Sequence, residues 1–239
     1  MLPRFVGRLG LADAVTTANA ALGFVAVVVA FSDVELAARL VLLGAIADGL
    51  DGVVARYVGG SNVGPYLDSL ADVATFCVAP AVLVYAAVDA TWPVSFDPLT
   101  AQTVATAVVP ALFVSMGVVR LGMYTAYDAG DEFTEGAPTT LAATIISASV
   151  LCGVHEPTVL LAGTAAFVYL MVSRIRYPDL LARDALLMGV VHALAVLVPY
   201  QFGRTFPWAI LTLGIAYLVA GPLFYWRGGW VLTKLYGNA

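Results

Sequence analysis

Four aspartates and one arginine lie between residues 48 and 72, in a part of the chain that is otherwise strongly apolar. Asp48 and Asp51 are three residues apart, and Asp68 and Asp72 are four apart, so on helices each pair projects from one face. The residues at 59–65 are mostly Gly, Ser, Asn and Pro, which favour a turn. Two helices joined by a short turn run antiparallel, and this arrangement brings the two carboxylate pairs to face each other.

Four facing carboxylates require a cation, because an ionised group in a membrane helix costs at least ~2.5 to 3.5 kcal/mol on insertion scales. Arg56 cannot neutralise all four. Hard oxygen ligands in this number suit Mg²⁺ or Mn²⁺, which take their remaining ligands from water and from substrate phosphates. We therefore predict a metal site, holding two ions, formed by Asp48, Asp51 and Asp68 with a contribution from Asp72.

The same residues resemble the motif of the CDP-alcohol phosphotransferases, D-x-x-D-G-x-x-A-R followed by seven or eight residues and G-x-x-x-D-x-x-x-D. The matching positions are Asp48, Asp51, Gly52, Ala55, Arg56, Gly64, Asp68 and Asp72. The resemblance implies an all-α polytopic membrane fold, a homodimer, and transfer of a substituted phosphoryl group from a CDP-linked lipid to an alcohol with release of CMP. It also implies that Asp72 is the base that accepts the proton of the alcohol.

The remaining motif positions are expected to bind the CDP-linked lipid. Gly52 would let the nucleotide approach the helix backbone, and Ala55 would leave space on the same side. Arg56 pairs either with a donor phosphate or with a motif aspartate. Gly64 completes the motif. In the first apolar segment, Thr17 and Asn19 match a T-x-N pattern of the family; Asn19 either contacts the nucleotide or forms an interhelical hydrogen bond.

Two further segments resemble the phosphatidylserine synthases within that family. They are DSLADVATFCVAP after the motif and FTEGAPTT at 133–140. Val119, Arg120 and Leu121 also resemble the arginine-containing fourth helix of the subfamily. The chain departs from the subfamily pattern at Cys77, Met123, Ala137 and Thr140 and has one extra residue before Gly136. L-serine is a zwitterion, so its pocket needs a cation. Arg120 is the candidate, with a snorkelling interfacial arginine as the alternative reading. Asp131 or Glu135 would face the ammonium group, unless they belong to a solvated acidic loop. Glycerol phosphate, inositol phosphate and inositol remain alternative acceptors.

The composition is that of an integral membrane protein. The 239 residues are 61% hydrophobic and 11% charged, with a mean hydropathy of +0.92, and the net charge of -5 argues against a nucleic-acid partner. We predict one domain over residues 1–239. About 20 apolar residues span a bilayer, and this length predicts eight spans, near 12–31, 36–58, 65–90, 100–126, 138–154, 157–175, 184–201 and 206–226.

The distribution of cations predicts the orientation in the cell membrane. With both termini inside, the inner side carries nine cations and the outer side two. The inner ones are Arg4, Arg8, Arg56, Arg120, Arg174, Arg176, Arg183, Arg227 and Lys234, and the outer ones are Arg39 and Arg204. The aspartates then face the cytoplasm. The sequence does not distinguish CDP-diacylglycerol from CDP-archaeol as the donor, because both present apolar chains to the protein.

Two other classes of membrane protein also place acids within the bilayer. An ion-coupled transporter would show repeats or broken helices in both halves of the chain, whereas these acids belong to one hairpin. A membrane prenyltransferase would need a second aspartate motif, and beyond Asp131 only Asp179 and Asp184 follow, in an expected loop. Both readings are weaker than the phosphotransferase.

Overall fold

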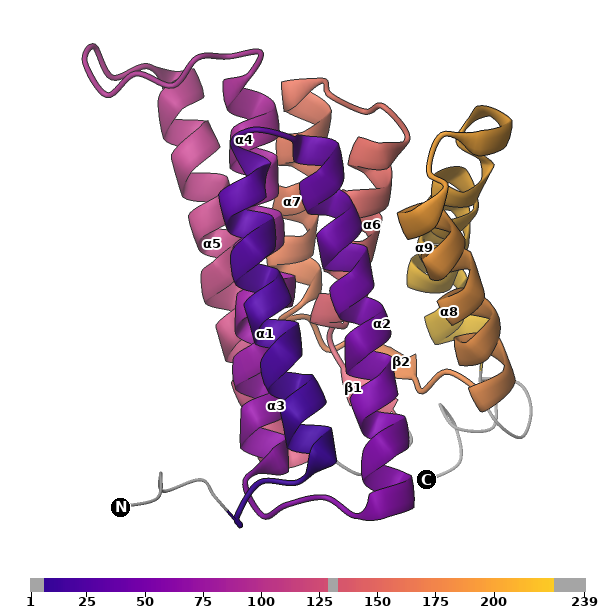
Figure 1. Ribbon diagram of the computed structural model, residues 1–239. Helices are drawn as coiled ribbons and strands as arrows, with labels where there is room; N and C mark the ends of the chain where they lie inside the picture. Colours follow the sequence, from indigo (N-terminus) through magenta and orange to yellow (C-terminus); the bar gives the residue numbers. More distant parts are fainter. Residues whose placement is uncertain (1–6, 129–132, 226–239) are drawn as a thin grey trace, which may run out of the picture.

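The computed structural model describes residues 7–128 and 133–225, which form a bundle of roughly antiparallel helices (Figure 1). The helices are α1 (Leu11–Ala30), α2 (Val34–Val58), α3 (Gly64–Asp72), α4 (Ala79–Asp89), α5 (Ala101–Met123), α6 (Thr139–Leu151), α7 (Pro157–Leu170), α8 (Ala182–Leu197) and α9 (Thr205–Phe224). Shorter helical turns are η1 (Val73–Val78), η2 (Tyr124–Asp128) and η3 (Gln201–Gly203). Each of the eight expected spans has a helical counterpart at nearly the expected bounds.

The third expected span is one continuous helix with an irregular centre. α3 passes through η1, a π-helical turn, into α4. A π-turn accommodates an extra residue and is frequent at functional sites. Asp72 is the last residue of α3, so the turn begins directly after the motif.

Local sequence explains where the helices begin and end. Asp33 caps α2 by accepting a hydrogen bond from the backbone N–H of Leu36 at 2.9 Å, and Thr100 caps α5 in the same way. α2 ends at Gly59, whose φ of 86° is a conformation that glycine adopts without strain. The predicted turn therefore starts where α2 must stop.

The described helices have the composition of a membrane protein. Four are long and apolar enough to cross a membrane, judged by length and composition: Leu11–Ala30, Gly64–Asp89, Ala101–Asp128 and Gln201–Phe224. α6 and α7 are shorter, at 13 and 14 residues. Large apolar side chains such as Phe24, Leu112 and Val219 are exposed. Apolar surface of this kind suits a lipid solvent.

The Gly64–Asp89 helix lies at the centre of the bundle. In its most apolar stretch 72% of the residues are buried, against 28 to 33% in the other three long helices. α4 and α6 supply much of the hydrophobic core. α8 and α9 form a separate pair beside α2 and α6 (Figure 1). The aspartates of α3 are thus carried by the most enclosed of the four long apolar helices.

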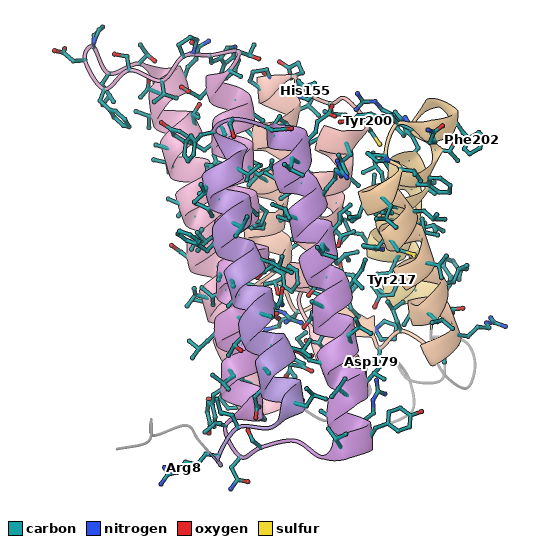
Figure 2. All side chains as sticks on the ribbon, in the orientation of Figure 1. Arg8, His155, Asp179, Tyr200, Phe202 and Tyr217 are labelled. Carbon is teal, nitrogen blue, oxygen red and sulfur yellow. The ribbon has the colours of Figure 1, made fainter. Side chains whose placement is uncertain are left out.

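The outer pair is fastened to the bundle at the end farthest from Arg8, where Figure 2 labels His155 and Tyr200. Arg204 donates to Glu35 Oε1 at 3.0 Å and to the backbone carbonyl of Leu151. The Tyr200 hydroxyl donates to the other carboxylate oxygen of Glu35 at 2.6 Å. These bonds join the start of α2, the end of α6 and the turn between α8 and α9.

A short ribbon of two strands was not expected from the sequence. β1 (Phe133–Glu135) pairs antiparallel with β2 (Arg176–Pro178), with Phe133 opposite Pro178. Gly136 follows β1 with a φ of 81°, and a Cβ at this position would collide with the backbone carbonyl of Met171. The ribbon joins the segment before α6 to the segment after α7. The fold remains that of a helical membrane protein, as predicted.

Candidate metal and phosphotransfer site

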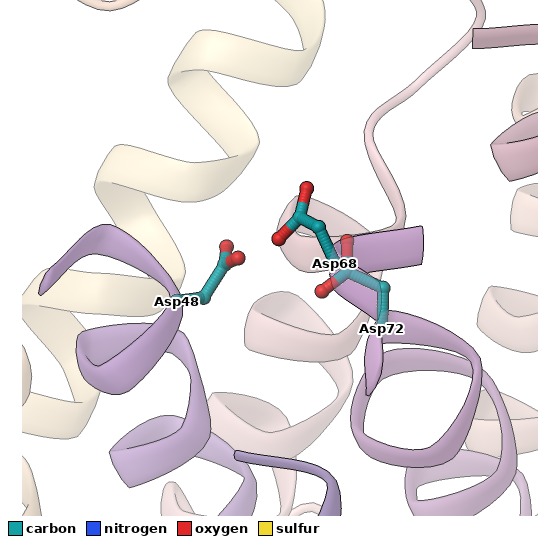
Figure 3. A group of neighbouring side chains, drawn as sticks. All are labelled: Asp48, Asp68 and Asp72. Atoms are coloured by element: carbon teal, nitrogen blue, oxygen red, sulfur yellow. The ribbon is translucent and has the colours of Figure 1, made fainter. Parts of the chain in front are cut away.

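Three of the four motif aspartates converge. Asp48 projects from α2 toward Asp68 and Asp72 on α3 (Figure 3), and one carboxylate oxygen from each lies within 4.8 Å of the others. The spacing explains the convergence, since residues four apart on α3 share a face and α2 runs antiparallel to it. These three residues are called the aspartate cluster below.

The aspartate cluster fits a hard divalent cation. Asp72 is 8% exposed, and its Oδ1 has no hydrogen-bond partner among the residues the structure describes. A buried, unpartnered carboxylate oxygen is costly unless a cation or a ligand satisfies it. Within the described chain the three salt bridges are all elsewhere, so no arginine forms a direct ion pair with the cluster. The cluster offers carboxylate oxygens, which are hard ligands that suit Mg²⁺ and Mn²⁺.

Asp51 is not one of the three residues of the aspartate cluster. It is 6% exposed, and its Oδ2 accepts a hydrogen bond from the Thr16 hydroxyl of α1 at 2.5 Å. A residue three positions after Asp48 is turned about 60° around the helix axis from it, and this rotation directs Asp51 toward α1. Its role as a metal ligand stays a prediction.

Thr16 was missed by the sequence analysis, which selected the neighbouring Thr17. Thr17 is exposed, and its hydroxyl donates within its own helix to the Ala14 carbonyl at 3.0 Å. Asp13 was also missed. The signal for both was present as a spacing of three residues between the polar positions Asp13, Thr16 and Asn19.

Asn19 lies in the interface between helices. It is 1% exposed, and its backbone carbonyl accepts a hydrogen bond from the Thr75 hydroxyl at 2.8 Å. Its Oδ1 has no hydrogen-bond partner among the described residues and lies beside Gly44, where an added Cβ would be 2.9 Å away. The side-chain oxygen thus forms no interhelical hydrogen bond with a described residue, and nucleotide contact by Asn19 stays a prediction.

The face of α2 that carries Gly52 is open. A Cβ added to Gly52 would meet no heavy atom within 4 Å, so protein packing does not explain the glycine. Arg56 is exposed and donates from Nε to the Gly52 carbonyl at 3.0 Å. Ala55 is half-buried one residue earlier. Arg56 forms no ion pair with Asp48 or Asp51 in the described chain, and its contact with a donor phosphate stays a prediction.

Gly64 begins α3 beside α1. A Cβ at Gly64 would stand 3.5 Å from Asp13 Oδ1 and 3.8 Å from the Ser61 hydroxyl, which are ordinary contacts. Gly64 is therefore close to the turn, and its expected contact with the donor lipid stays a prediction.

Arg120 is a buried cation near the cluster. It is 7% exposed, which excludes a snorkelling side chain. Its Nη2 donates to the Thr134 hydroxyl at 3.0 Å, and its guanidinium lies 4.9 Å from the centre of the Tyr124 ring. Its Nε has no partner among the described residues. A buried guanidinium with a free donor is suited to an anionic group of a ligand.

The acidic residues expected near Arg120 are placed differently. Glu135 pairs at the surface with Arg176, at 3.2 Å, and Asp131 lies outside the described residues. Asp128, which the sequence analysis did not select, accepts from the Thr134 hydroxyl at 3.4 Å and from the Glu135 backbone N–H at 3.2 Å. Asp128 is thus the carboxylate connected to Arg120 through Thr134.

Comparisons with known proteins agree with this geometry. The chain is 32% identical to the archaetidylserine synthase of Methanothermobacter thermautotrophicus over 179 residues, which cover 71% of the chain and 70% of that protein. It is 30% identical to the CDP-diacylglycerol–serine O-phosphatidyltransferase of Bacillus subtilis over 62% of the chain and 77% of that protein. The enzyme of the same name from Mycobacterium tuberculosis is 36% identical over 53% of the chain and 41% of its own length.

The sequence profile of one family matches nearly the whole helical bundle. It is the profile described as CDP-alcohol phosphatidyltransferase, and the match covers residues 9–219, a range that includes all eight motif positions. This match argues against the two alternative interpretations, an ion-coupled transporter and a membrane prenyltransferase. The chain belongs to the CDP-alcohol phosphatidyltransferase family.

Proposed function

We propose that this protein transfers the phosphatidyl or archaetidyl group of a CDP-linked lipid to the hydroxyl of L-serine and releases CMP. The observation that carries the proposal is the aspartate cluster, three convergent carboxylates with a buried unpartnered oxygen, in a chain of this family. The names of the relatives from Methanothermobacter and Bacillus support serine as the acceptor.

The proposed reaction is a single displacement at phosphorus. The serine oxygen forms a bond to the lipid-side phosphorus, the bond from that phosphorus to the bridging oxygen breaks, and CMP leaves with the electron pair. Asp72 accepts the proton of the serine hydroxyl. Asp72 is shared between this role and a metal contact, and its unpartnered Oδ1 supports both, because no described residue hydrogen-bonds to it.

Asp48, Asp51, Asp68 and Asp72 are the proposed ligands of Mg²⁺ or Mn²⁺. Bound divalent ions would supply charge stabilisation to the phosphoryl oxygens. The protein's own contribution is to hold the carboxylates together in a partly buried site, where electrostatic interactions are stronger than in water. The open surface at Gly52 accommodates the nucleotide, with Ala55, Arg56, Gly64 and Asn19 as further donor contacts.

Arg120 is the proposed partner of the serine carboxylate. Its free Nε and its burial support this assignment, because a guanidinium binds a carboxylate through two parallel hydrogen bonds. Asp128, joined to Arg120 through Thr134, is the proposed partner of the ammonium group. An acceptor with a phosphate of its own would meet Asp128 as a repulsive charge.

We propose that the aspartate site faces the cytoplasm and that the protein forms homodimers. The cation distribution supports both termini inside. Arg204 lies against the ring of Tyr200, and Tyr200 is at the end of the bundle opposite to Arg8 (Figure 2), as this orientation requires. Arg4, Arg227 and Lys234, which contribute to the predicted bias, lie outside the described residues. Labelling of single cysteines placed at 61 and 155 in intact cells tests the orientation, since only one of the two should react with an impermeant reagent.

Release of CMP by purified protein in detergent tests the reaction. CDP-diacylglycerol and CDP-archaeol are each supplied with Mg²⁺ or Mn²⁺, and serine, glycerol phosphate, inositol phosphate and inositol are compared as acceptors. We expect release that requires both metal and serine, and that ceases with a chelator. Release with another acceptor would retain the mechanism and remove serine; no release with any combination would refute the proposal.

A further inference from the structure

One face of α1 is polar and buried, although α1 is among the helices apolar enough to cross a membrane. Asp13, Thr16 and Asn19 on this face are 2%, 6% and 1% exposed. Buried polar groups in a membrane helix are costly, and they usually bond to neighbouring helices. The polar face of α1 contacts the turn, the first helix and the second helix of the hairpin that carries the aspartates.

Asp13 fixes the turn of the hairpin. Its Oδ1 accepts a hydrogen bond from the Ser61 hydroxyl at 2.9 Å, and its Oδ2 accepts from the backbone N–H of Gly10 at 2.7 Å. The bond to Gly10 closes the first turn of α1 and orients the Asp13 carboxylate, whose other oxygen contacts Ser61 in the loop between α2 and α3. Ser61 is 48 residues away in sequence, and the bond ties the turn between the two halves of the motif to the start of α1.

Thr16 fixes the carboxylate of Asp51. Its hydroxyl is 2.5 Å from Asp51 Oδ2 and 3.1 Å from the carbonyl of Ala12. A hydroxyl has one proton to donate, and the shorter contact to an anionic acceptor is the stronger bond. One oxygen of Asp51 is therefore occupied, which determines the direction of the other.

Closer to the membrane centre, α1 touches the second helix of the hairpin. A Cβ at Gly23 would lie 2.7 Å from the Thr75 hydroxyl and 2.9 Å from the Ala74 backbone, so the two helices are in direct contact. This contact and the Thr75 bond to Asn19 fix the separation between α1 and η1. α1 is consequently a rigid reference for both arms of the hairpin.

We infer that Thr16 and Asp13 are positioning residues that set the affinity of the aspartate site for its metal. Thr16 acts through the orientation of Asp51, and Asp13 acts through Ser61 and the turn. The inference rests on the proposed metal site. Groups that orient metal ligands typically alter metal affinity by about 10- to 100-fold when they are removed, and a direct bond to a carboxylate belongs to that class.

Metal binding without substrate tests the inference. Mn²⁺ is titrated into the purified full-length protein in detergent, and free Mn²⁺ is followed by its paramagnetic resonance signal. Thr16→Val preserves the shape of the side chain and removes the hydroxyl, and we expect affinity to fall about 10- to 100-fold. Thr16→Ser keeps the hydroxyl and should bind like the natural protein. Thr17→Val is the matched control on the exposed side of the same helix.

The turn provides a second, independent variant. Ser61→Ala removes the bond to Asp13 and alters no proposed metal ligand, and we expect Mn²⁺ affinity to fall several-fold. Asn62→Ala changes the exposed neighbouring residue and should leave Mn²⁺ affinity unchanged. A cooperative thermal unfolding transition without metal shows that each variant is folded. If Thr16→Val does not fold, the Mn²⁺ affinity of Ser61→Ala decides the test.

The outcomes separate the inference from the function on which it rests. Equal Mn²⁺ affinity in Thr16→Val, Ser61→Ala and the natural protein would overturn the positioning role and leave the proposed reaction intact. An equal loss in Thr16→Val and Thr17→Val would also overturn it, since a general loosening of α1 would then explain both. Absence of Mn²⁺ binding by the natural protein would overturn the metal site and the inference with it.

Discussion

The contact between Cys77 and Gly117 predicts a pair of substitutions that compensate each other. Cys77, fully buried in η1, occupies a position where the phosphatidylserine synthase pattern has glycine, and Gly117 of α5 faces it. A Cβ added to Gly117 would overlap the Cys77 sulfur. Since non-bonded carbon atoms rest about 3.5 to 4.0 Å apart, α5 would have to move by roughly 1 Å. The cysteine is accommodated because the opposing residue has no side chain.

Gly117→Ala should therefore destabilise the protein and impair its activity. Overpacking lowers the free energy of unfolding by about 1 to 3 kcal/mol. For a chain of this size each kcal/mol lowers Tm by about 2 to 4 °C. Arg120 follows Gly117 by three residues, so α5 carries the displacement toward the site. A misplacement of 1 Å can reduce turnover on the order of 100-fold.

Cys77→Ala should rescue Gly117→Ala. Without the sulfur the nearest atom to the new methyl group is the Cβ at position 77, at 3.3 Å, which is only slightly tighter than ordinary contact. Thermal midpoints and CMP release are measured for both single variants and the double variant. Gly163→Ala is the control, because a Cβ there meets no heavy atom within 4 Å. A double variant no better than Gly117→Ala would refute this account of the interface.

Three further predictions concern the site. Asp72→Asn should abolish CMP release while CDP-lipid binding, measured separately, persists; unchanged turnover would remove Asp72 as the base. Arg120→Ala should raise the KM for serine by roughly 10- to 100-fold, because a hydrogen bond to a charged group is worth about 1.5 to 3 kcal/mol, and an equal rise in the donor KM would contradict a carboxylate contact. Gly52→Ala should preserve Tm, since its Cβ meets no protein atom within 4 Å, yet raise the donor KM; a fall in Tm with unchanged KM would assign the glycine to packing.

The sequence was sufficient for the helical bounds and for the aspartate cluster. Apolar length determines where a membrane helix begins and ends, and the spacing of Asp68 and Asp72 places them on one face whatever surrounds them. Gly59 and Pro65 then locate the turn. These features depend only on distances along one chain segment, so no knowledge of the neighbouring helices was required.

The rotation of α1 could not be predicted. Lipid and protein core are both apolar, so a membrane helix lacks the contrast between wet and dry faces that orients a helix of a soluble protein. For this reason Thr17 was selected instead of Thr16. Thr16 would have been predicted as buried only if Asp13 and Asn19 had been taken to mark the buried face of α1. In the loop near Arg120, Asp128 was missed because the short β1–β2 pairing depends on two segments about forty residues apart.

The π-helical turn after Asp72 has a consequence for alignments of this family. One extra residue rotates everything beyond it by about 100° relative to a regular helix. Residues of α3 and residues of α4 therefore follow two helical patterns in the sequence that are offset from each other by one residue. Deleting one residue within 73–78 would turn the wide turn into a regular α-helix and leave the aspartates and the core residues in their present directions. A single gap within 73–78 is therefore compatible with the same active site, whereas a gap elsewhere in the span would rotate the aspartates relative to the core.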